Sequence, residues 1–216
     1  MKELVKEFDA FSLWKITGKV ELEKLSRLVI SVNYKHHLNQ QSYPNDEFIK
    51  IYGEDIQALS NSDFYAIYDN KNEIFASVKC QKWNNSTILA IEKDFRIDLM
   101  YFIRGLNFQP REVFHIGRFV IDQDKIRKNT LLRQKRLDIL KLLMYYALFP
   151  VFNSSYNIFF CECDEKLFSK LNLLGLYPQT IGTPMEYMGS ETIPIFCDYN
   201  GIKEFFNRNK NINHVS

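Results

Sequence analysis

The chain has 216 residues, 46% of them hydrophobic and 15% aromatic, with a formal net charge of +2. This composition is that of an ordinary globular protein with a sizeable core. No apolar run approaches the roughly 20 residues that span a bilayer, and the nearly balanced charge argues against a nucleic-acid binder. The N-terminal MKELVKEFDAF lacks the long apolar core of a signal peptide, so we expect a cytoplasmic protein.

The first half of the chain predicts one helix, three strands and a short helix. Helical spacing of apolar residues indicates a helix over 20–38. Two strands with cores at 65–68 and 74–80 flank a polar turn. A third strand is predicted over 86–95. Residues 98–106 fit a short helix or a bulged strand, and the helix is favoured.

A long apolar strand and a helix dominate the middle of the chain. Residues 112–121 are nearly all apolar, which predicts a central strand covered on both faces. A helix is expected over 130–149, ended by Pro150. Its predicted buried stripe consists of Leu137, Leu140, Met144 and Leu148. Another apolar strand follows over 156–164.

The last elements are shorter. A helix over 165–176 is closed by Gly175, a typical residue after a helix end. Residues 185–199 predict a hairpin that turns near Gly189. A terminal helix then gives way to a polar tail from about residue 207.

This order of elements predicts the fold class. Helices alternate with strands, so we expect an α/β (α+β) chain with a mixed central sheet flanked by helices. The strand 112–121, the helix 130–149 and the strand 156–162 suit a parallel crossover. With no repeat and no linker-like composition, a single domain over 1–216 is the simplest organisation.

The cysteines do not predict a metal site. Their spacing matches no zinc-binding pattern, so no metal is expected. We expect all of them to be buried, reduced and structural, since a free thiol is usually found inside a protein. They are Cys80, Cys161, Cys163 and Cys197.

Positive charge is concentrated between the central strand and the helix that follows. Residues 125–137 hold six basic residues and no acid, whereas the rest of the chain carries 22 basic and 26 acidic residues. Such a local positive field suits an anionic ligand near a helix start. The alternative is a helix with one solvated face, and the charge pattern alone leaves both readings open.

Three local motifs stand out along the chain: HIGRFVID (115–122), NEIFASVK (72–79), and LNLLGL with GTPMEYMGSETIPIF (171–196). Together they resemble the GNAT acyltransferases, most closely the branch of acyl-homoserine-lactone (autoinducer) synthases and N-acyl amino acid synthases. The first is similar to that branch's Glu-(Leu/Ile)-Ser-Arg-Phe-(Val/Ala)-Val strand and the second to its GEIVGTVR. The third resembles its Leu-x-x-x-Gly and Gly-x-Pro-x-x-Tyr-x-Gly ending.

The resemblance implies a GNAT-like fold with a splayed pair of parallel strands, here 112–121 and 156–162. The phosphopantetheine arm of an acyl donor would lie between them and pair with the exposed strand edge. Gly117, Phe119 and Val120 are therefore expected to bind the donor, with a backbone N–H facing the thioester oxygen. A β-bulge would assist this arrangement, and Gly117 tolerates one.

Departures from the family pattern fall on the residues of the site. The family's proton-handling acid corresponds to His115, its serine to Gly117 and its arginine of GTVR to Lys79, whereas Arg118 and Phe119 are kept. A strict homoserine-lactone synthase would keep the acid. The resemblance therefore implies an N-acyltransferase with another small amine acceptor, such as an amino acid or an amino lipid head group.

His115 and Arg118 are the candidate catalytic residues. A free imidazole titrates at about pH 6.5 and an α-amine at about 8, so His115 could accept the amine proton. The alternative is a hydrogen-bonded core histidine. Strand alternation places Arg118 on the opposite face from His115, so both act in one site only if the strand bulges. Arg118 could instead pair structurally with Asp122 or Glu162.

The acceptor is expected to contact Lys79 and Asp55. In the family, a mobile acceptor-binding segment follows the first helix, and residues 36–55 occupy that place. Asp55, at the end of this segment, would then bind a cationic acceptor.

The basic segment implies the kind of donor. Acetyl-CoA-dependent members of the fold carry a glycine-rich loop before this helix, but IRKNTLLRQKR contains no glycine. This favours acyl carrier protein, an acidic partner with one phosphate, over acyl-CoA. No permanently bound cofactor is implied. The candidate docking residues are Arg127, Lys128, Arg133 and Arg136.

Two other functions stay open at this point. An acetyl-CoA-dependent N-acetyltransferase would have the same fold, although the missing glycine loop argues against it. A non-catalytic GNAT-like domain that only binds a partner would explain the replaced acid at His115.

Overall fold

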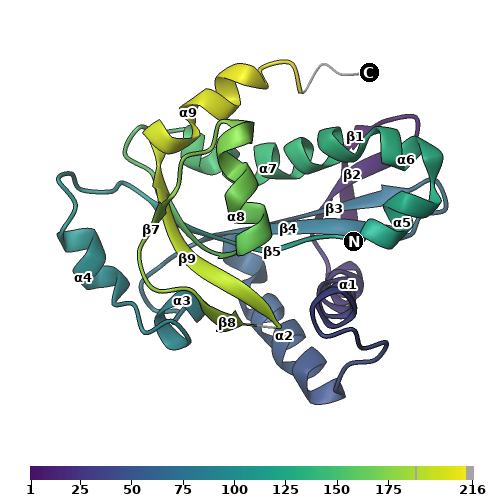
Figure 1. The fold of residues 1–216 in the computed structure, drawn as a ribbon, viewed down its shortest axis with the longest axis horizontal. Coiled ribbons are helices and arrows are strands. Elements are labelled where there is room, and N and C mark those ends of the chain that lie inside the picture. The colour runs from purple at the N-terminus through teal and green to yellow at the C-terminus, as the bar shows by residue number, and fades with distance from the viewer. Residues whose placement is uncertain (188, 213–216) are drawn as a thin grey trace. The chain divides into compact units, whose positions relative to one another are not determined.

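The computed structural model describes residues 1–187 and 189–212. The chain forms two compact units, each built from both halves of the sequence. Figure 1 labels the helices and strands of both units. Unit 1 consists of Met1–Lys79 and Arg118–Ala147, and unit 2 of Cys80–Gly117 and residues 148–212. Each unit is described by itself below, and a single domain over 1–216 stays a prediction. The end of the predicted polar tail, 213–216, lies outside the described residues.

The strands of unit 1 follow the order β1-β2-β3-β4-β5. The first three pair antiparallel, and β4 and β5 continue from this unit into unit 2. The N-terminal hairpin of β1 and β2 is absent from the sequence prediction, because β1 fully buries none of its residues and shows no regular alternation. The strands are β1 (Lys2–Glu7), β2 (Phe11–Ile16), β3 (Ser62–Asp69), β4 (Ile74–Lys82) and β5 (Val113–Ile121).

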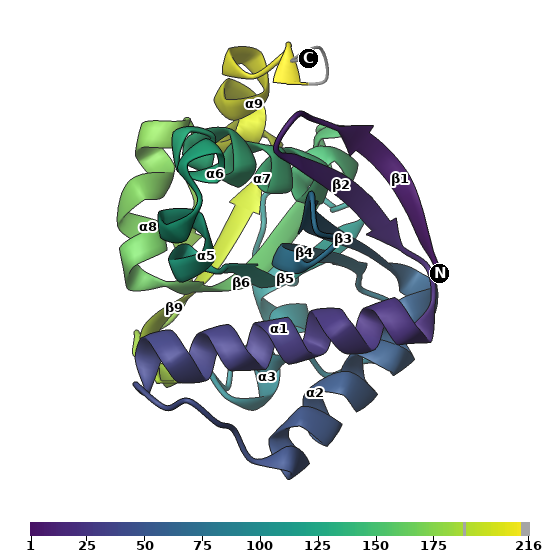
Figure 2. The ribbon, with the colours of Figure 1, turned by 90° about the vertical axis from the view of Figure 1, so that its right-hand side faces the viewer.

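Helices cover both faces of the unit 1 strands. Figure 2 shows α1 with α2 beside it on one face and α6 with the first turns of α7 on the other. A 3-10 turn, Leu59–Asn61, joins α2 to β3. The helices are α1 (Lys19–His37), α2 (Asn45–Ala58), α5 (Gln123–Lys128), α6 (Thr130–Gln134) and α7 (Arg136–Phe152), the last continuing into unit 2.

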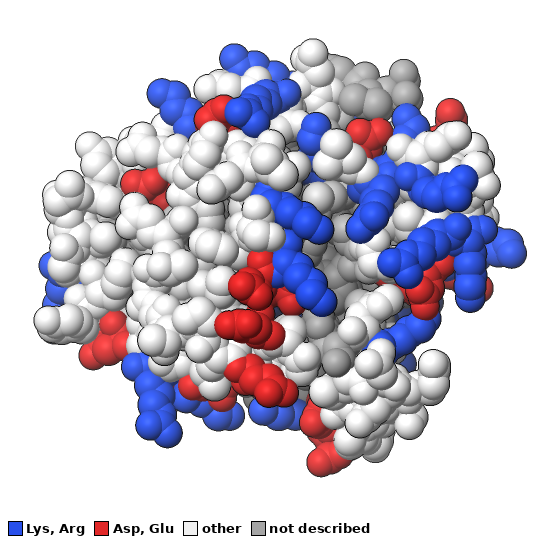
Figure 3. Space-filling view, viewed as in Figure 1, with Lys and Arg blue, Asp and Glu red and all other residues white. Residues whose placement is uncertain are grey.

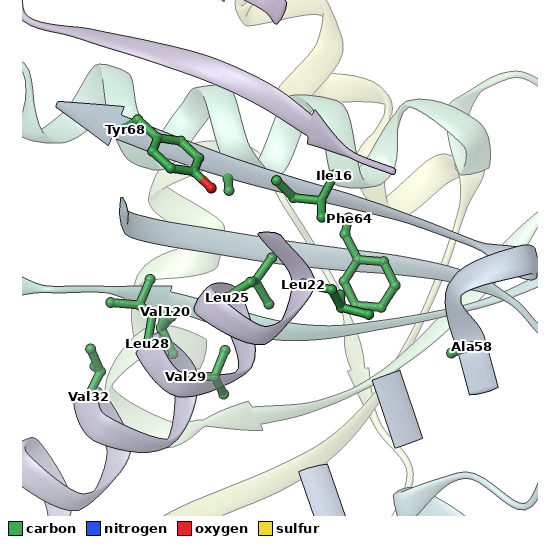
Figure 4. Packing of buried hydrophobic residues seen from close by; sticks show 11 residues of the cluster. Ile16, Leu22, Leu25, Leu28, Val29, Val32, Ala58, Phe64, Tyr68 and Val120 are labelled. Carbon is green, nitrogen blue, oxygen red and sulfur yellow. The ribbon is translucent and has the colours of Figure 1, made fainter. Parts of the chain in front are cut away.

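A hydrophobic cluster holds α1 against the strands of unit 1 (Figure 4). Leu22, Leu25 and Val29 recur at helical spacing and face Phe64 of β3 and Val120 of β5. Burying each large apolar side chain stabilises the fold by roughly 1.5–3 kcal/mol. The predicted helix and its buried face are therefore confirmed.

Unit 2 is centred on β6 and β9. Within it the strand order is β4-β5-β6-β9-β7, and β8 pairs with β9. β5 and β6 are parallel, as the crossover predicted, whereas β9 is antiparallel to β6, β7 and β8. The predicted hairpin is confirmed in its two strands. The further strands are β6 (Ile158–Asp164), β7 (Gln179–Thr180), β8 (Met185–Tyr187) and β9 (Ser190–Asp198).

The short helices of unit 2 include one correction. The strand predicted over 86–95 is wrong: the segment is a turn followed by α3. Asn84 accepts hydrogen bonds from Ser86 and Thr87, and the Glu92 carboxylate accepts from the Leu89 N–H at the start of the helix. The helices are α3 (Ala90–Lys93), α4 (Leu99–Arg104), α8 (Glu165–Leu171) with the 3-10 turn Asn172–Leu174, and α9 (Tyr199–Arg208).

The helix predicted over 130–149 is broken into pieces. Asn129 accepts hydrogen bonds from the N–H groups of Leu131 and Leu132, which starts α6 separately from α5. A further break at Lys135 changes which side chains of the next helix face the core. Leu137 is therefore exposed, and Ile139 is buried in its place. Pro150 does not end α7, which continues to Phe152. The Pro150 carbonyl accepts a hydrogen bond from the Asn157 side chain.

The backbone conformation at position 175 requires a glycine. Its φ is +83°, and an added Cβ would lie 3.1 Å from the backbone nitrogen of Phe205. We expect Gly175→Ala to lower the free energy of unfolding by about 1–2 kcal/mol, because an L-residue is strained there. Gly53→Ala, inside α2 with open space around it, is the matched control and should raise it by roughly 0.5–1 kcal/mol. Denaturant unfolding measures both, and equal effects would contradict the assignment.

The described helices include none that is both long and apolar enough to cross a membrane. All four cysteines lie in the described part of the chain and form no disulfide. Cys80, Cys163 and Cys197 are buried as expected, whereas Cys161 is only partly so. Burial raises the pKa of Cys161 well above its usual range and that of Cys163 to about 12, so these thiols stay protonated.

Candidate active site

His115 pairs with Glu162 inside unit 2. His115 Nε2 lies 2.8 Å from Glu162 Oε2, and the two side chains expose only 7% and 8% of their surface. The other ring nitrogen, Nδ1, is buried and has no hydrogen-bond partner among the described residues. Buried polar atoms without a partner are uncommon in folded proteins. This nitrogen is therefore a candidate contact for a ligand.

The parallel strands β5 and β6 place this pair. Their ladder runs from Val113–Ile158 to Ile116–Cys161, and His115 lies opposite Phe160. Because side chains alternate along a strand, Glu162 lies on the same face as Phe160 and so on the face of His115. The ladder then stops, although β6 continues to Asp164 and stays paired with β9. Beyond Cys161, the side of β6 that faces β5 takes no part in that ladder.

Arg118 has an unusual backbone in unit 1. Its φ is 54°, the left-handed conformation found in one type of β-bulge. The irregularity thus lies one residue after Gly117, the position that the sequence favoured. For a non-glycine residue this backbone conformation lowers the stability of the fold by of order 1–3 kcal/mol, so it is found where surrounding contacts hold it in place. Here the Ser77 hydroxyl donates to the Arg118 carbonyl at 2.9 Å.

A buried ion-pair network binds the Arg118 side chain. Its Nε donates to Asp55 Oδ1 at 2.8 Å and its Nη2 to Glu54 Oε2 at 2.9 Å. Ser26 Oγ donates to the other Asp55 oxygen at 2.8 Å. Although burial lowers the pKa of Arg118, the charges and hydrogen bonds of Asp55 and Glu54 raise it above its usual range. The guanidinium is therefore charged.

These contacts correct one expectation. Arg118 pairs with neither Asp122 nor Glu162, so that prediction was wrong. The Asp122 carboxylate instead accepts hydrogen bonds from the N–H groups of Asp124 and Lys125 and begins α5, while Glu162 pairs with His115.

The two predicted acceptor residues are both buried in unit 1. Asp55 is 0% exposed, and each of its carboxylate oxygens already accepts a hydrogen bond. Lys79 lies in β4 and is also buried. The segment 36–55, expected to be mobile, forms helix α2 from Asn45 onwards.

The remaining predicted donor residues occupy different surroundings. Gly117 of unit 2 and Phe119 of unit 1 are partly buried. The side chain of Val120 belongs to the hydrophobic cluster under α1. Any donor contact of Val120 would thus involve its backbone.

The basic segment is mostly exposed, as its composition predicted. Figure 3 shows Lys and Arg gathered over the region of α5 and α6. Lys125 is the exception, because it bridges Asp69 at 2.9 Å and Glu73 at 2.8 Å. Arg127 lies 3.8 Å from Asp124. Within the described chain no ion pair engages the other predicted docking residues, which are Lys128, Arg133 and Arg136.

Sequence reasoning missed two partners in these networks. Glu162 was not recognised as the partner of His115, nor Glu54 as a partner of Arg118. Glu162 did carry a signal, because it is the charged residue inside the otherwise uncharged run IFFCEC (158–163). The described residues contain no group of three or more His, Cys, Asp or Glu that could hold a metal ion.

No protein-family model and no characterised protein sequence matches the chain. Solved structures do match it at low sequence identity. FeeM, an N-acyl amino acid synthase from uncultured soil microbes, has a TM-score of 0.60 at 11% identity, covering 97% of this chain and 100% of its own. A GNAT-family acetyltransferase from Staphylococcus aureus Mu50 has a TM-score of 0.53 at 11% identity, covering 88% and 99%.

The chain has the GNAT acyltransferase fold. The predicted fold class and the resemblance are thus confirmed at the level of the fold. The GNAT fold of this chain is also similar to that of BjaI, a CoA-dependent acyl-homoserine-lactone synthase solved with SAM and isopentyl-CoA. The TM-score is 0.58 at 11% identity, over 89% of this chain and 82% of BjaI.

Proposed function

We propose that the protein is an N-acyltransferase that moves an acyl group from a thioester donor to the amine of a small acceptor. The donor is acyl carrier protein or acyl-CoA, and the acceptor is an amine such as an amino acid or an amino lipid head group. The fold shared with FeeM and BjaI supports this class of reaction.

The observation that carries the proposal is the end of the β5–β6 ladder. The last paired residues are Ile116 and Cys161, so the residues of β6 after Cys161 pair with no residue of β5 in that ladder. An extended phosphopantetheine arm can pair with such an edge as an added strand does. His115, next to this point, brings a buried nitrogen without a partner to the same place.

The reaction requires one proton acceptor. The acceptor nitrogen forms a bond to the thioester carbonyl carbon, and the C–S bond of the donor then breaks. The nitrogen loses a proton, which His115 accepts and which the departing sulfur finally takes up. A backbone N–H near Gly117 is proposed to stabilise the developing oxyanion.

The exposed cations supply the proposed docking surface for the donor. An acidic carrier protein with a phosphate is attracted by a local cluster of exposed positive charges. Asp55 and Lys79 stay proposals for acceptor binding. Since both Asp55 oxygens are already bonded, contact with an acceptor would have to replace one of those bonds.

Mass spectrometry of lipid extracts tests the proposal. Cells expressing the chain should contain N-acylated amines that are absent from cells with an empty vector. The purified protein is then assayed on those amines with acyl carrier protein, long-chain acyl-CoA and acetyl-CoA as donors. Unchanged extracts together with no turnover of any donor would contradict the proposal, and turnover of acetyl-CoA alone would identify an N-acetyltransferase.

Reversal of two exposed charges tests the docking surface. We expect Arg127→Glu with Arg133→Glu to weaken binding of acyl carrier protein by roughly tenfold or more, because two attractive contacts become repulsive. Surface plasmon resonance at two salt concentrations measures the effect.

The matched control is Lys166→Glu with Lys203→Glu. These two lysines are exposed, Lys166 near the start of α8 and Lys203 in the middle of α9, and they undergo the same change of charge. The control pair should bind the carrier as the unsubstituted protein does. Equal affinity of both double variants would show that the basic segment is only the solvated face of a helix and does not bind the carrier.

A further inference from the structure

The partner of His115 is the strongest feature that the sequence motifs do not explain. Glu162 lies on β6, is buried, and places Oε2 2.8 Å from His115 Nε2. A carboxylate only accepts hydrogen bonds, so it fixes which nitrogen of a neighbouring imidazole carries the proton.

The hydrogen bond between the two side chains can run in either direction, because the donor depends on the tautomer of His115. An imidazole nitrogen is ordinarily a stronger base than a carboxylate oxygen, which favours Nε2 as the donor and Glu162 Oε2 as the acceptor. If the ring instead carried its only proton on Nδ1, two lone pairs would face each other at 2.8 Å. A buried N–H at Nδ1 would also lack an acceptor among the described residues.

We infer that Glu162 is a positioning residue that holds His115 in the Nε2–H tautomer, so that the lone pair of Nδ1 accepts the proton of the acceptor amine. This inference rests on the proposed function. In the transfer step the N–C bond forms, the C–S bond breaks, and the amine proton moves to Nδ1 and then to the leaving sulfur. The proton on Nε2 stays in its bond to Glu162 and stabilises the imidazolium that forms in between.

The fold explains why this pair is rigid. Glu162 lies in the stretch of β6 whose backbone pairs with β9, opposite Pro194, and His115 lies in the stretch of β5 that pairs with β6. Both side chains thus project from paired strands rather than from loops, which keeps their separation fixed. The contact also lies one residue from the end of the β5–β6 ladder, where the donor arm is proposed to bind.

Nuclear magnetic resonance of the whole protein tests the tautomer without any substrate. Long-range ¹H–¹⁵N correlation spectra distinguish a ring nitrogen that carries a proton from one that does not. The sequence has four histidines, and His115→Asn identifies the His115 signals by their loss. We expect a protonated Nε2 and an unprotonated Nδ1 at the pH of the assay. The Nδ1–H tautomer, or a doubly protonated ring throughout the active pH range, would overturn the inference.

Kinetics of Glu162→Gln test its role in the reaction. The neutral amide no longer selects one tautomer, so we expect kcat to fall by about tenfold or more with KM little changed. Glu162→Asp should recover part of the loss. The control Glu112→Gln, which removes the charge of a glutamate that pairs with Lys82 at the surface, should keep the original kcat.

The outcomes separate the inference from the function on which it rests. The Nε2–H tautomer in a protein that transfers no acyl group would refute the proposed function. Acyl transfer that survives Glu162→Gln at full rate, or the wrong tautomer in the unsubstituted protein, would refute the role of Glu162. The spectrum of the unsubstituted protein needs no change at Glu162, so it decides even if such changes prevent folding.

Discussion

Replacing His115 by glutamine is expected to lower the rate of acyl transfer by about 10²–10⁴-fold, the usual contribution of a positioned general base. Glutamine is of similar size and can keep a hydrogen bond to Glu162, so the strand pairing should survive. What it lacks is a nitrogen that accepts the amine proton. Single-turnover measurement with a saturating donor isolates the chemical step from donor binding.

Tyr101→Gln is the control for this change. Tyr101 lies in α4, in unit 2, is 79% exposed and has no place in the proposed reaction. Replacing this exposed ring by glutamine should leave the rate unchanged, and circular dichroism should show both variants folded. A His115→Gln protein as fast as its control would make His115 a core histidine and remove the proposed base.

Replacing Arg118 by methionine is expected to lower the free energy of unfolding by about 3–5 kcal/mol, because it leaves the buried carboxylate of Asp55 without its counter-ion. Asp55 is completely buried and Arg118 nearly so, with side-chain exposures of 0% and 13%. Methionine keeps the apolar stem and is, like arginine, a residue with a Cβ at φ 54°. The loss of stability thus reports the charge rather than the backbone. Denaturant unfolding measures it.

Two further variants define this ion pair. Arg118→Met combined with Asp55→Asn should recover much of the lost stability, because neither charge is then left unpaired. Glu54→Gln should change the stability by less than about 1 kcal/mol, since Glu54 is 51% exposed. A single Arg118→Met variant as stable as Glu54→Gln would show that the network does not stabilise unit 1.

The fold could be predicted where the pattern of apolar residues is regular. The stripe of α1 and the nearly continuous apolar strands β5 and β6 gave correct elements, because each buries one stripe or both faces. Prediction failed where local hydrogen bonds decide the structure. The strand expected over 86–95 is a turn fixed by the Asn84 side chain, and the long helix is divided by the Asn129 cap.

The site could be predicted in its residues but not in its partners. His115 and Arg118 stood out against the strand motif, whereas their acidic partners lie 47 and 63 positions away in the sequence. Only the register of β5 with β6 brings Glu162 to His115, and only the packing of α2 brings Asp55 to Arg118. A one-residue shift in either element would have given other pairs, and no pattern along a single chain fixes that register.

The distribution of thiols has a practical consequence. All four cysteines, from Cys80 to Cys197, belong to unit 2 and none to unit 1. Because Cys163 and Cys197 are buried and burial suppresses formation of their thiolates, an alkylating reagent can modify these two side chains only when that unit opens. The rate at which these thiols are modified therefore measures how often unit 2 opens. Amide hydrogen exchange in unit 1, followed in the same sample, would show whether the two units open in one cooperative event.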